Sequence, residues 1–532
     1  MRKIKVLFVY PPFPVNHRHK VVIPISLCRI AAYLVHKVPD VQLSVFDAHI
    51  QEVSIEDILA HIEAYTPDVV AVGYWTCQAP FVYELSKRIR TLSRSIMVVH
   101  GGIHASFSWE EALQYCDAAV IGEGERTFSQ LIQAIRENRG FETVKGLAFK
   151  RDGQVVKTPP QPLIENLDDI PFPAFELFDI KKYIESGRLR QLHVVGGKRM
   201  PVLASRGCPY DCHFCLSPTM WGKNVRWRSP NNVLDEIRKL HNLFGFTNFQ
   251  FYDDNFLLNK SFVVELCKGI PSLGFDIKWV ALSRAKDVIE SRDILKTLKD
   301  AGCVGIEMGI ETSDKKVLEK INKQQEIDWV DRAVKLQKNA GLSPLYTLMV
   351  FSPGETISSI RNIRAYIEEK IPESISYNHF GAAPFITLGQ FSTPYPGTCF
   401  YKERLKEGMI LVDDWSDMFH HQLNFLPHTF LEDVPSVKKP LSEETIEQCV
   451  KTAEISLFKY FPGDEKVEDE NRREMKDIAV KFHSLSNGKK SIREIAEQIS
   501  RERRIDRTKV LRFVAAAIIV LAQKGIITGN GG

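Results

Sequence analysis

Three cysteines lie close together in one short loop, and this loop constrains the chain more than any other feature of the sequence. Cys208, Cys212 and Cys215 have the spacing C-x3-C-x2-C, directly after the apolar run Met200–Ala204. That run predicts a strand, and Gly207 lets the chain turn out of it. Three thiolates can hold a [4Fe-4S] cluster and leave one iron without a protein ligand, and an open metal position binds a small molecule. A zinc ion with a distant histidine as fourth ligand is the alternative.

The same loop resembles the motif of the radical S-adenosylmethionine (SAM) superfamily, C-x3-C-x-(aromatic)-C, with Phe214 at the aromatic position. In that superfamily the open iron is chelated by the amino and carboxylate groups of SAM, and one electron cleaves SAM to a 5′-deoxyadenosyl radical. The resemblance implies a [4Fe-4S] cluster on the three cysteines and SAM as a cofactor beside Phe214. It also implies an electron donor of the flavodoxin or ferredoxin type.

Length and composition describe a globular protein of several domains. The 532 residues favour about three domains, and 44% hydrophobic with 26% charged residues leaves ample core. A net charge of +4 gives little support for nucleic acid as a partner. The first residues predict a strand and not a signal peptide, and the longest apolar run, Phe513–Ala522, is too short to span a bilayer. The other cysteines are scattered, so we expect a reducing cytoplasm and no disulfide framework.

Residues 1–150 alternate between apolar runs typical of strands and stretches typical of helices. This pattern predicts an α/β fold with a doubly wound parallel sheet, similar to the Rossmann fold, whose ligand binds beyond the carboxyl ends of the strands. The expected strands are Ile4–Tyr10, Val41–Phe46, Val69–Gly73, Met97–His100 and Ala118–Ile121. The expected helices are Ser26–His36, Ile55–Ala64, Pro80–Leu92, Trp109–Tyr115 and Thr127–Glu137. No G-x-G-x-x-G follows the first strand, which argues against a nicotinamide or flavin dinucleotide.

The segments after these strands resemble the cobalamin-binding domain that precedes many radical SAM barrels. The resemblance rests on Pro11-Pro12, on Gly101-Gly102-x-His104-Ala-Ser106 and on Gly122-Glu-Gly-Glu125. It implies that cobalamin lies on the strand ends, although His104 is alternatively a loop residue satisfied by backbone hydrogen bonds. The implied cobalamin contacts are Pro11, Tyr74, Trp75, Thr76, Gly101, Gly102, His104, Ser106, Gly122, Glu123, Gly124 and Glu125.

The motif that supplies an axial histidine in many cobalamin proteins, D-x-H-x-x-G after the first strand, is missing from this sequence. Asp47-Ala-His49 follows the second strand instead and lacks the glycine. The resemblance therefore implies base-off cobalamin, carried as methylcobalamin, whose lower face has no histidine ligand and faces Tyr74 or Trp75. The histidines left open as alternative ligands are His17, His19 and His49.

Residues 151–190 form a Pro-rich connector, and residues 191–410 alternate again between strands and helices. This alternation predicts a parallel barrel whose ligands gather at the carboxyl ends of the strands, and the resemblance implies a partial barrel of six strands. Asp253 and Asp254 end the second barrel strand, and Arg284 follows the third. Glu307 and Glu311 leave the fourth strand on one face if the alternation is regular.

By resemblance, Asp253 or Asp254 holds the SAM amino group and Arg284 faces the SAM carboxylate. Glu307 and Glu311 are implied as further SAM contacts, because buried carboxylates need partners. The alternative for either aspartate is a turn or helix cap. A departure from the family occurs after the fifth strand, where Phe351-Ser-Pro-Gly-Glu-Thr356 replaces the more usual Gly-x-Pro-Gly-Glu-Thr.

Residues 411–532 predict a mostly helical region. Leu441–Phe461 predicts an amphipathic helix, Glu465–Arg473 a charged linker, and Ser491 with Glu494 a capping box. The order of elements after residue 481 is similar to that of a small winged-helix module. A structural role as a cap over the barrel is favoured over a role in peptide binding. Interleaved acidic residues argue against DNA binding. The histidines that either lie over the substrate or simply pack are His420, His421 and His428.

Together these resemblances imply a cobalamin-dependent radical SAM enzyme, and most enzymes of this architecture are methyltransferases. One SAM would methylate cob(I)alamin, and a second would yield the radical that lets a substrate carbon accept the methyl group. Two alternatives stay open: a radical cyclisation, oxidation or rearrangement without methyl transfer, and a cobalamin- or redox-responsive binding protein. The substrate, a small molecule or a peptide, is not named by the sequence because substrate contacts lie on loops that the motifs do not constrain.

Overall fold

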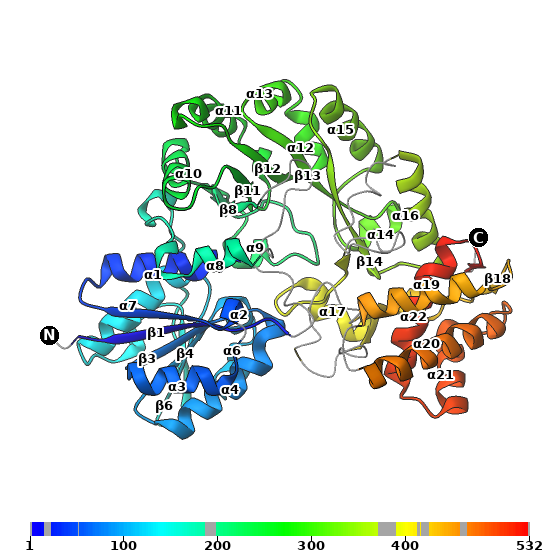
Figure 1. The fold of residues 1–532 in the computed structure, drawn as a ribbon, viewed down its shortest axis with the longest axis horizontal. Helices are drawn as coiled ribbons and strands as arrows, with labels where there is room; N and C mark the ends of the chain where they lie inside the picture. Colours follow the sequence, from blue (N-terminus) through cyan, green and yellow to red (C-terminus); the bar gives the residue numbers. More distant parts are fainter. Residues whose placement is uncertain are drawn as a thin grey trace.

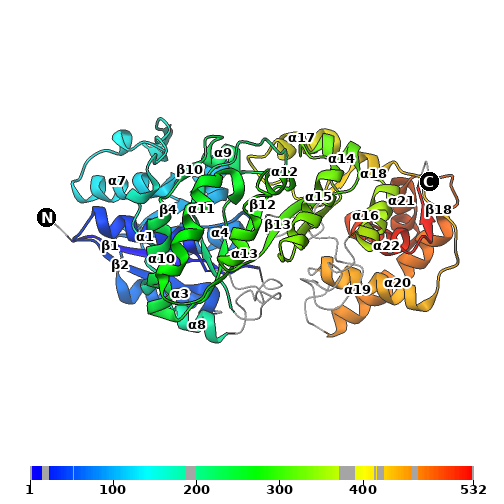
Figure 2. The same ribbon diagram turned by 90° about the horizontal axis from the view of Figure 1, so that it is seen from above.

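The computed structural model describes residues 3–14, 23–51, 53–186, 198–370, 390–411, 415, 425–457 and 465–529. The chain forms three parts, which Figure 1 shows as a sheet domain at lower left, a barrel above it and a group of helices at right. Seen from above, the sheet domain and the helical part lie at opposite ends of the molecule (Figure 2). No helix in these described ranges combines the length and the apolar character needed to cross a membrane.

The first part is a seven-stranded sheet in the order β2-β1-β3-β4-β5-β6-β7. Strands β1 to β5 are parallel, which confirms the predicted doubly wound sheet, and β6 and β7 add an antiparallel edge. Because β7 belongs to this sheet, the first part extends past residue 150 to Lys157. The strands are β1 Lys5–Tyr10, β2 Gln42–Asp47, β3 Val69–Gly73, β4 Met97–Gly101, β5 Ala118–Val120, β6 Leu147–Arg151 and β7 Gln154–Lys157.

Helices cover both faces of this sheet, as the alternating side chains of β1 require. Val6 and Phe8 belong to one apolar cluster, while Leu7 and Val9 belong to another. Successive strand residues point to opposite faces, so each cluster lies under different helices. The first cluster includes residues of α1 and α7, and the second includes residues of α3 and α4. The helices are α1 Ile25–Lys37, α2 Ala48–Gln51, α3 Ile55–Tyr65, α4 Ala79–Leu92, α5 Gly102–Phe107, α6 Trp109–Ala112 and α7 Gly124–Arg136.

The second part is a sheet of six parallel strands in the order β15-β14-β13-β12-β11-β8. This arrangement confirms the partial six-stranded barrel. The strands are β8 Met200–Val202, β11 Asn248–Phe251, β12 Lys278–Ser283, β13 Cys303–Glu311, β14 Leu345–Val350 and β15 Gln390–Phe391. The helices are α9 Ser217–Trp221, α10 Pro230–Phe244, α11 Lys260–Gly269, α12 Ala285–Glu290, α13 Leu295–Asp300, α14 Lys315–Lys320, α15 Ile327–Asn339, α16 Ile357–Lys370 and α17 Cys399–Glu407.

A short two-stranded sheet lies between the first part and the barrel. It pairs β9 Ser205–Arg206 with β10 Arg226–Trp227 in antiparallel fashion, so that Arg206 is opposite Arg226. The connector before it contributes α8, Ile180–Glu185. This small sheet holds the two ends of the cysteine loop together.

The third part is a helical bundle built around α22, which is buried along most of its length. Helix α22 packs against α19, α20 and α21 and against the barrel helix α16. The predicted linker at residues 465–473 is wrong, because these residues form the first half of α20. The buried apolar side chains of this helix lie in its second half, at Met475, Ile478 and Phe482. The elements are α18 His428–Leu431, α19 Glu443–Ser456, α20 Glu465–Leu485, α21 Ile492–Arg503, α22 Arg507–Gln523 and the pairs β16 Gly408–Ile410 with β17 Phe425–Pro427 and β18 Ser436–Val437 with β19 Ile527–Thr528.

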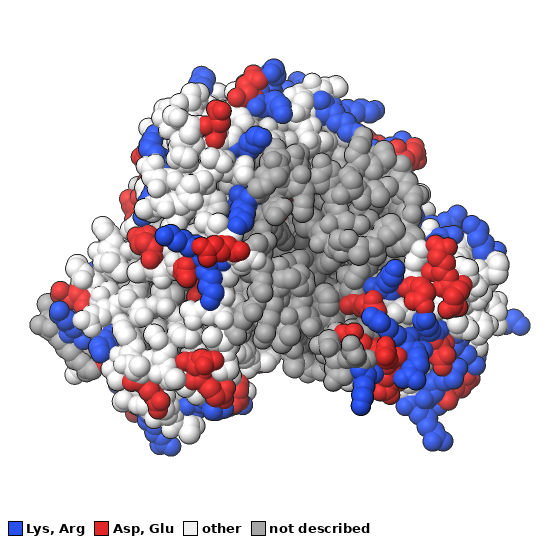
Figure 3. Space-filling view, in the orientation of Figure 1, with Lys and Arg blue, Asp and Glu red and all other residues white. Residues whose placement is uncertain are grey.

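Two predicted helix starts in the bundle are confirmed in detail. The Ser442 side chain caps α19, and Ser491 and Glu494 form the capping box of α21. Positive and negative side chains alternate over these helices in Figure 3, and many are paired, as Arg472 is with Glu454 at 2.6 Å. A face of mixed, paired charges supports a structural cap more than a surface for nucleic acid.

Candidate active site

The cysteine loop connects β9 to α9 and is held by the barrel at several points. The backbone N–H of His213 donates to the carbonyl of Ile321 at 3.0 Å, and the carbonyl of His213 accepts from the N–H of Phe400 at 3.0 Å. Gly207 has a φ of 109°, and a Cβ there would lie 2.8 Å from the carbonyl oxygen of Asn224. The loop therefore needs glycine at this turn, and its path is fixed by the end of α14 and the start of α17.

The three cysteines have free thiols and are partly buried. Burial raises the pKa of the Cys208 thiol to about 11 and that of the Cys215 thiol to about 12. The Cys215 sulfur accepts the N–H of Ser217 at 3.4 Å, and the Cys212 sulfur accepts Nη1–H of Arg284 at 3.4 Å. Donors aimed at sulfur are the outer partners that cluster-bound thiolates take. These residues fit a cluster held by three thiolates.

Across the described ranges, no three His, Cys, Asp or Glu side chains are grouped around the position of one metal ion. A [4Fe-4S] cluster does not require such a group, because each thiolate binds a different iron.

The two aspartates after β11 have different surroundings. The Asp253 carboxylate accepts from the backbone N–H of Ala204 at 3.2 Å and from the Ser205 hydroxyl, and burial raises its pKa to about 6. The Asp254 carboxylate accepts from the Ser217 hydroxyl at 2.5 Å and lines a cavity beside the cysteine loop. Of the two predicted SAM contacts, Asp254 is therefore the one exposed to a ligand, and Asp253 is bound to the backbone at the end of β8.

Arg284 is committed to contacts within the protein. Besides Cys212, its guanidinium donates to the carbonyls of Lys323 and Gln324, and it lies 3.8 Å from the centre of the Tyr210 ring. These contacts hold the turn after α14 against the cysteine loop. The predicted contact with the SAM carboxylate stays a prediction.

The carboxylate of Glu311 is buried and pairs with the ammonium of Lys323 at 2.7 Å. The pairing of β13 with β14 shifts between Gly309 and Glu311, and Glu311 has a φ of 66°. The prediction that Glu311 shares one face of the strand with the half-buried Glu307 assumed that side chains alternate regularly along β13. This bulge interrupts that alternation. Lys323 also lies 5.7 Å from the ring centre of Phe214, which packs against residues of α14.

Phe351 adopts a φ of 61° at the position where the family more often has glycine. Its ring stacks on Phe391 with centroids 5.9 Å apart and meets Phe430 edge-on at 4.9 Å. The departure from the family motif thus preserves a backbone shape that glycine adopts easily, because aromatic packing holds the strained residue in place.

A cavity of about 190 Å³ lies between the strand ends of the first part and the cysteine loop. Gly73 and Gly122 line it from the sheet side, and a Cβ at either position would meet no atom within 4 Å. Bare backbone with open space above it is a surface on which a large planar ring can lie. The residues present therefore fit a corrin ring on the strand ends. The cavity is also lined from the barrel side by Leu203, Ser205, Arg206, Met220, Trp221, Tyr252 and Asp254.

The structure brings only part of the predicted cobalamin set to this cavity. Gly101, Gly102, Gly122, Gly124 and Glu125 line it. The predicted residues outside its lining are Pro11, Tyr74, Trp75, Thr76, His104, Ser106 and Glu123.

Tyr74 points away from the cavity and does not face the position predicted for the lower face of cobalamin. Its side chain is buried in the core under α4, and its hydroxyl lies 3.1 Å from Nδ1 of His100. Trp75, the other predicted partner, is 40% exposed. The reason for the difference is that the residue directly after β3 turns to the face of the sheet covered by α4.

The histidines considered as ligands are placed elsewhere. Burial lowers the pKa of His104 to about 4, and its Nε2 lies 2.9 Å from the Tyr83 hydroxyl, so its ring bonds to a side chain and not to the backbone. His49 lies between the rings of Tyr10 and Phe13 and is not among the residues that line the cavity. Ser106 links two glycine turns by donating to the carbonyl of Gly102 and accepting from the N–H of Gly122. Of the histidines considered from the sequence, His17, His19, His420 and His421 lie outside the described residues.

Sequence reasoning missed several residues of the cavity wall. Arg29, Arg206, Trp221 and Tyr252 line the cavity, and none of them was predicted as a site residue. Two of them adjoin a motif, since Arg206 lies two residues before Cys208 and Tyr252 directly precedes Asp253. Their positions next to chemistry-bearing residues were the available signal.

Two family models match the two parts that form the cavity. The B12 binding domain model matches residues 13–132, and the radical SAM superfamily model matches residues 202–367. An uncharacterized methyltransferase of Pyrococcus horikoshii is 31% identical over 468 residues, which cover 86% of this chain and 93% of that protein. This chain belongs to the radical SAM enzymes that carry a B12-binding domain. Members of this family use a [4Fe-4S] cluster, SAM and cobalamin, the three cofactors that the sequence motifs implied.

Two further similarities add detail. The anaerobic magnesium-protoporphyrin IX monomethyl ester cyclase of Synechocystis is 27% identical over 434 residues, which cover 80% of this chain and 82% of that one. The structure of the cobalamin-dependent SAM radical enzyme OxsB, with aqua-cobalamin and SAM bound, matches with a TM-score of 0.64 at 15% identity. The match covers all of this chain and 82% of that chain, and it confirms the fold.

Proposed function

We propose that this radical SAM enzyme is a methyltransferase that places a methyl group on an unactivated carbon of its substrate. One observation carries the proposal: a single cavity is bounded by the bare glycine turns of the B12-binding part and by the wall next to the cysteine loop. Such an arrangement lets a methyl donor and a radical source act on the same substrate atom. The 31%-identical relative named as a methyltransferase supports the same reaction.

When bound, the cluster with SAM supplies a radical that abstracts hydrogen, and cobalamin carries the methyl group. The protein's own work is to bind, orient and shield these groups. Cys208, Cys212 and Cys215 would hold three irons, and Asp254 would accept a charge-assisted hydrogen bond from the SAM ammonium. The other side chains predicted to contact SAM would surround the SAM position next to Asp254. They are Phe214, Asp253, Arg284, Glu307 and Glu311.

The sheet side of the cavity would hold cobalamin through shape. Gly73, Gly101 and Gly122 leave the strand ends bare, so a flat ring can approach the backbone. Among the residues that the structure describes, His100 is the one histidine that lines the cavity, and its two ring nitrogens bond to Tyr74 and Ser86. This arrangement supports base-off cobalamin without a histidine ligand.

The partners proposed are a small-molecule or peptide substrate and a flavodoxin or ferredoxin as electron donor. All ten cysteines have free thiols, which suits a reducing cytoplasm. The helical third part is proposed as a cap on the barrel, because its central helix α22 packs directly on α16.

A radical reaction without methyl transfer is the second candidate, and the 27%-identical cyclase favours it. The two reactions consume SAM differently. A methyltransferase converts one SAM to S-adenosylhomocysteine for each radical event, whereas a cyclase or oxidase leaves only 5′-deoxyadenosine.

The deciding experiment is anaerobic reconstitution with iron, sulfide and hydroxocobalamin, followed by SAM and a reductant, with products read by mass spectrometry. S-adenosylhomocysteine together with 5′-deoxyadenosine is the result expected of a methyltransferase. Deoxyadenosine alone would favour the second candidate. A protein that binds neither cobalamin nor a cluster would contradict both.

A further inference from the structure

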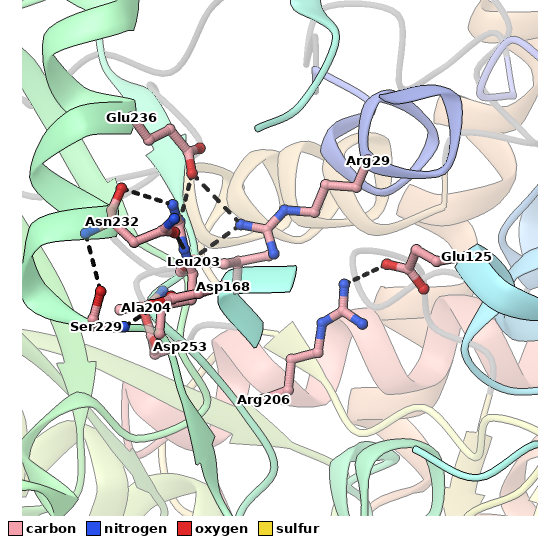
Figure 4. A network of polar contacts seen from close by, with 11 residues as sticks. Arg29, Glu125, Asp168, Leu203, Ala204, Arg206, Ser229, Asn232, Glu236 and Asp253 are labelled. Carbon is pink, nitrogen blue, oxygen red and sulfur yellow. Dashed lines mark hydrogen bonds and ion pairs between the residues drawn. The ribbon is translucent and has the colours of Figure 1, made fainter. Parts of the chain in front are cut away.

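Seven charged side chains are buried together where the B12-binding part meets the barrel, and Figure 4 shows much of this group. They come from helix α1, from the start of α7, from the small sheet β9–β10 and from α10. Charges are rarely buried unless they are paired, so each pairing here has a structural consequence. The side chains are Arg29, Glu123, Glu125, Arg206, Arg226, Arg228 and Glu236.

Arg206 is the member of this group that bonds from the barrel side to the B12-binding part through both terminal nitrogens of its guanidinium. Its Nη1 lies 3.0 Å from Oε1 of Glu123, and its Nη2 lies 2.5 Å from Oε1 of Glu125. A planar guanidinium that binds two fixed carboxylates has little freedom to move. Arg206 thus attaches the barrel side to the start of α7 at two points, Glu123 at its N-cap and Glu125 in its first turn.

Glu123 joins three segments of the chain at one carboxylate. Oε1 also receives Nη2 of Arg226 at 2.8 Å, and Oε2 accepts the backbone N–H of Ile164 in the connector at 2.9 Å. Arg226 is the strand partner of Arg206 and donates to the carbonyl of Ile164 at 2.7 Å. The B12-binding part, the connector and the barrel therefore meet at Glu123.

The electrostatics keep the Arg206 pair ionised despite its burial. Burial alone would raise the pKa of the Glu125 carboxyl. The attraction of the Arg206 guanidinium is larger than this effect and lowers the pKa below its ordinary value. Burial would likewise lower the pKa of Arg206, and the two glutamates outweigh it and raise that pKa. A buried pair of this kind contributes less to stability than to a defined geometry.

The pair is also close to both cofactor sites along the chain. Arg206 lies two residues before the first cysteine, Cys208, and its guanidinium lies 5.0 Å from the ring centre of Trp221. Glu125 lies three residues after the bare Gly122, and Arg206, Glu125 and Gly122 all line the cavity. A displacement of Arg206 would therefore move the cysteine loop relative to the glycine turns.

We propose that Arg206 is a positioning residue that fixes the separation between the cobalamin face and the iron–sulfur cluster by pairing with Glu123 and Glu125 across the domain boundary. This inference rests on the proposed function, because it concerns how the two cofactors are held for one reaction. A displacement of about 1 Å between reacting groups is enough to cost an enzyme about 100-fold in rate. A rigid tie at this boundary is thus a requirement of the chemistry.

The test uses the reconstituted full chain with cob(II)alamin bound and the cluster reduced, since both centres are then paramagnetic. Their magnetic interaction, read by electron paramagnetic resonance, reports their separation without any substrate. In Arg206→Met, which keeps the apolar stem and removes the charge, we expect both cofactors to bind and the interaction to change by an amount corresponding to about 1 Å or more. An interaction identical to that of the parent protein would overturn the inference.

Arg228→Met is the matched control. Arg228 is equally buried, but it bonds to Glu236 and Asn232 of the barrel helix α10. Glu236 also lies 3.9 Å from Arg29 of α1, and removal of Arg228 leaves that contact across the boundary in place. Loss of the Arg228 charge should lower the stability of the protein without changing the magnetic interaction. If Arg228→Met changed the magnetic interaction as much as Arg206→Met does, Arg206 would have no specific positioning role and the inference would be overturned. If Arg206→Met does not fold, Glu125→Gln replaces it, because that change keeps the shape and removes one charge of the same pair.

The outcomes separate this inference from the function it rests on. Failure of the parent protein to bind cobalamin would contradict the proposed function itself and the inference with it. Normal binding of both cofactors with an unchanged interaction in Arg206→Met and Glu125→Gln would contradict only the positioning role.

Discussion

The two walls of the central cavity are built on opposite principles. The wall from the B12-binding part exposes bare backbone at the strand ends, with open space above Gly73 and Gly122, among mostly apolar side chains such as Phe8 and Phe128. The wall from the barrel presents polar side chains that are already bonded, Asp254 to Ser217 and Ser205 to Asp253, next to apolar ones such as Met220. We propose that the first wall binds a large flat ring by its shape, and that the second binds small charged groups through directed hydrogen bonds. Substitutions should therefore act by size on one wall and by charge on the other.

The largest expected effect is on the barrel wall at the cluster. Cys212→Ala should abolish the cluster and all cleavage of SAM, because two thiolates cannot hold the cubane with an open iron for SAM. Iron content and 5′-deoxyadenosine formation are the measurements. Cys399→Ala, at an exposed cysteine outside the loop, is the control and should behave like the parent. Formation of 5′-deoxyadenosine at the parent rate in Cys212→Ala would show that the cysteines were misassigned.

A size series at Gly73 tests the other wall. Gly73→Val should fold, since a strand accommodates valine and a Cβ there meets no atom within 4 Å. It should weaken cobalamin binding by about 100-fold, the equivalent of about 3 kcal/mol of steric overlap. Gly73→Ala should give a smaller loss. Titration of hydroxocobalamin followed by absorbance measures both variants, and equal affinity in the parent and Gly73→Val would place cobalamin elsewhere.

The barrel wall should respond to charge instead. Asp254→Asn keeps the size of the side chain and removes its charge, so SAM binding should weaken by about 30-fold, or about 2 kcal/mol. Asp253→Asn is the paired control, because that carboxylate is bound to Ala204 and Ser205 and should affect stability more than SAM affinity. Calorimetric titration of the cluster-loaded protein with SAM distinguishes them. A greater loss in Asp253→Asn would reverse the assignment.

Glu355 should have the smallest effect on cofactor binding of these positions, because its buried carboxyl acts on the stability of the fold. Burial raises the pKa of Glu355 to about 8, so the folded protein holds its proton more tightly than the unfolded chain does. The stability that this provides is complete below the ordinary pKa near 4.5 and is lost as the pH rises through about 8, by about 1.4 kcal/mol per pH unit within that window. Urea unfolding of the parent and of Glu355→Gln across this range measures it. Parallel stability curves for the two proteins would show that Glu355 is not the titrating group.

Local pattern was enough for much of the fold. The continuous apolar runs of β1 and β3, separated by helical stretches, placed the parallel sheet, and the same alternation of strands and helices after the cysteine loop located the barrel. Helix starts such as Ser491 with Glu494 were equally readable, because a cap is a contact between near neighbours in the chain. Long charged helices were harder, and α20 was taken for a linker because its polar face dominates its first half.

The sequence by itself determined which chemistry this protein carries: the cysteine loop, the glycine turns and their attachment to strand ends are local features with local causes. Only the tertiary structure decided which residues meet. It turned Tyr74 into the core, separated the roles of Asp253 and Asp254, and joined Arg206 to Glu123 and Glu125 over more than eighty residues. Such pairings depend on how two domains pack, and the packing energy is spread over many side chains that no short motif contains.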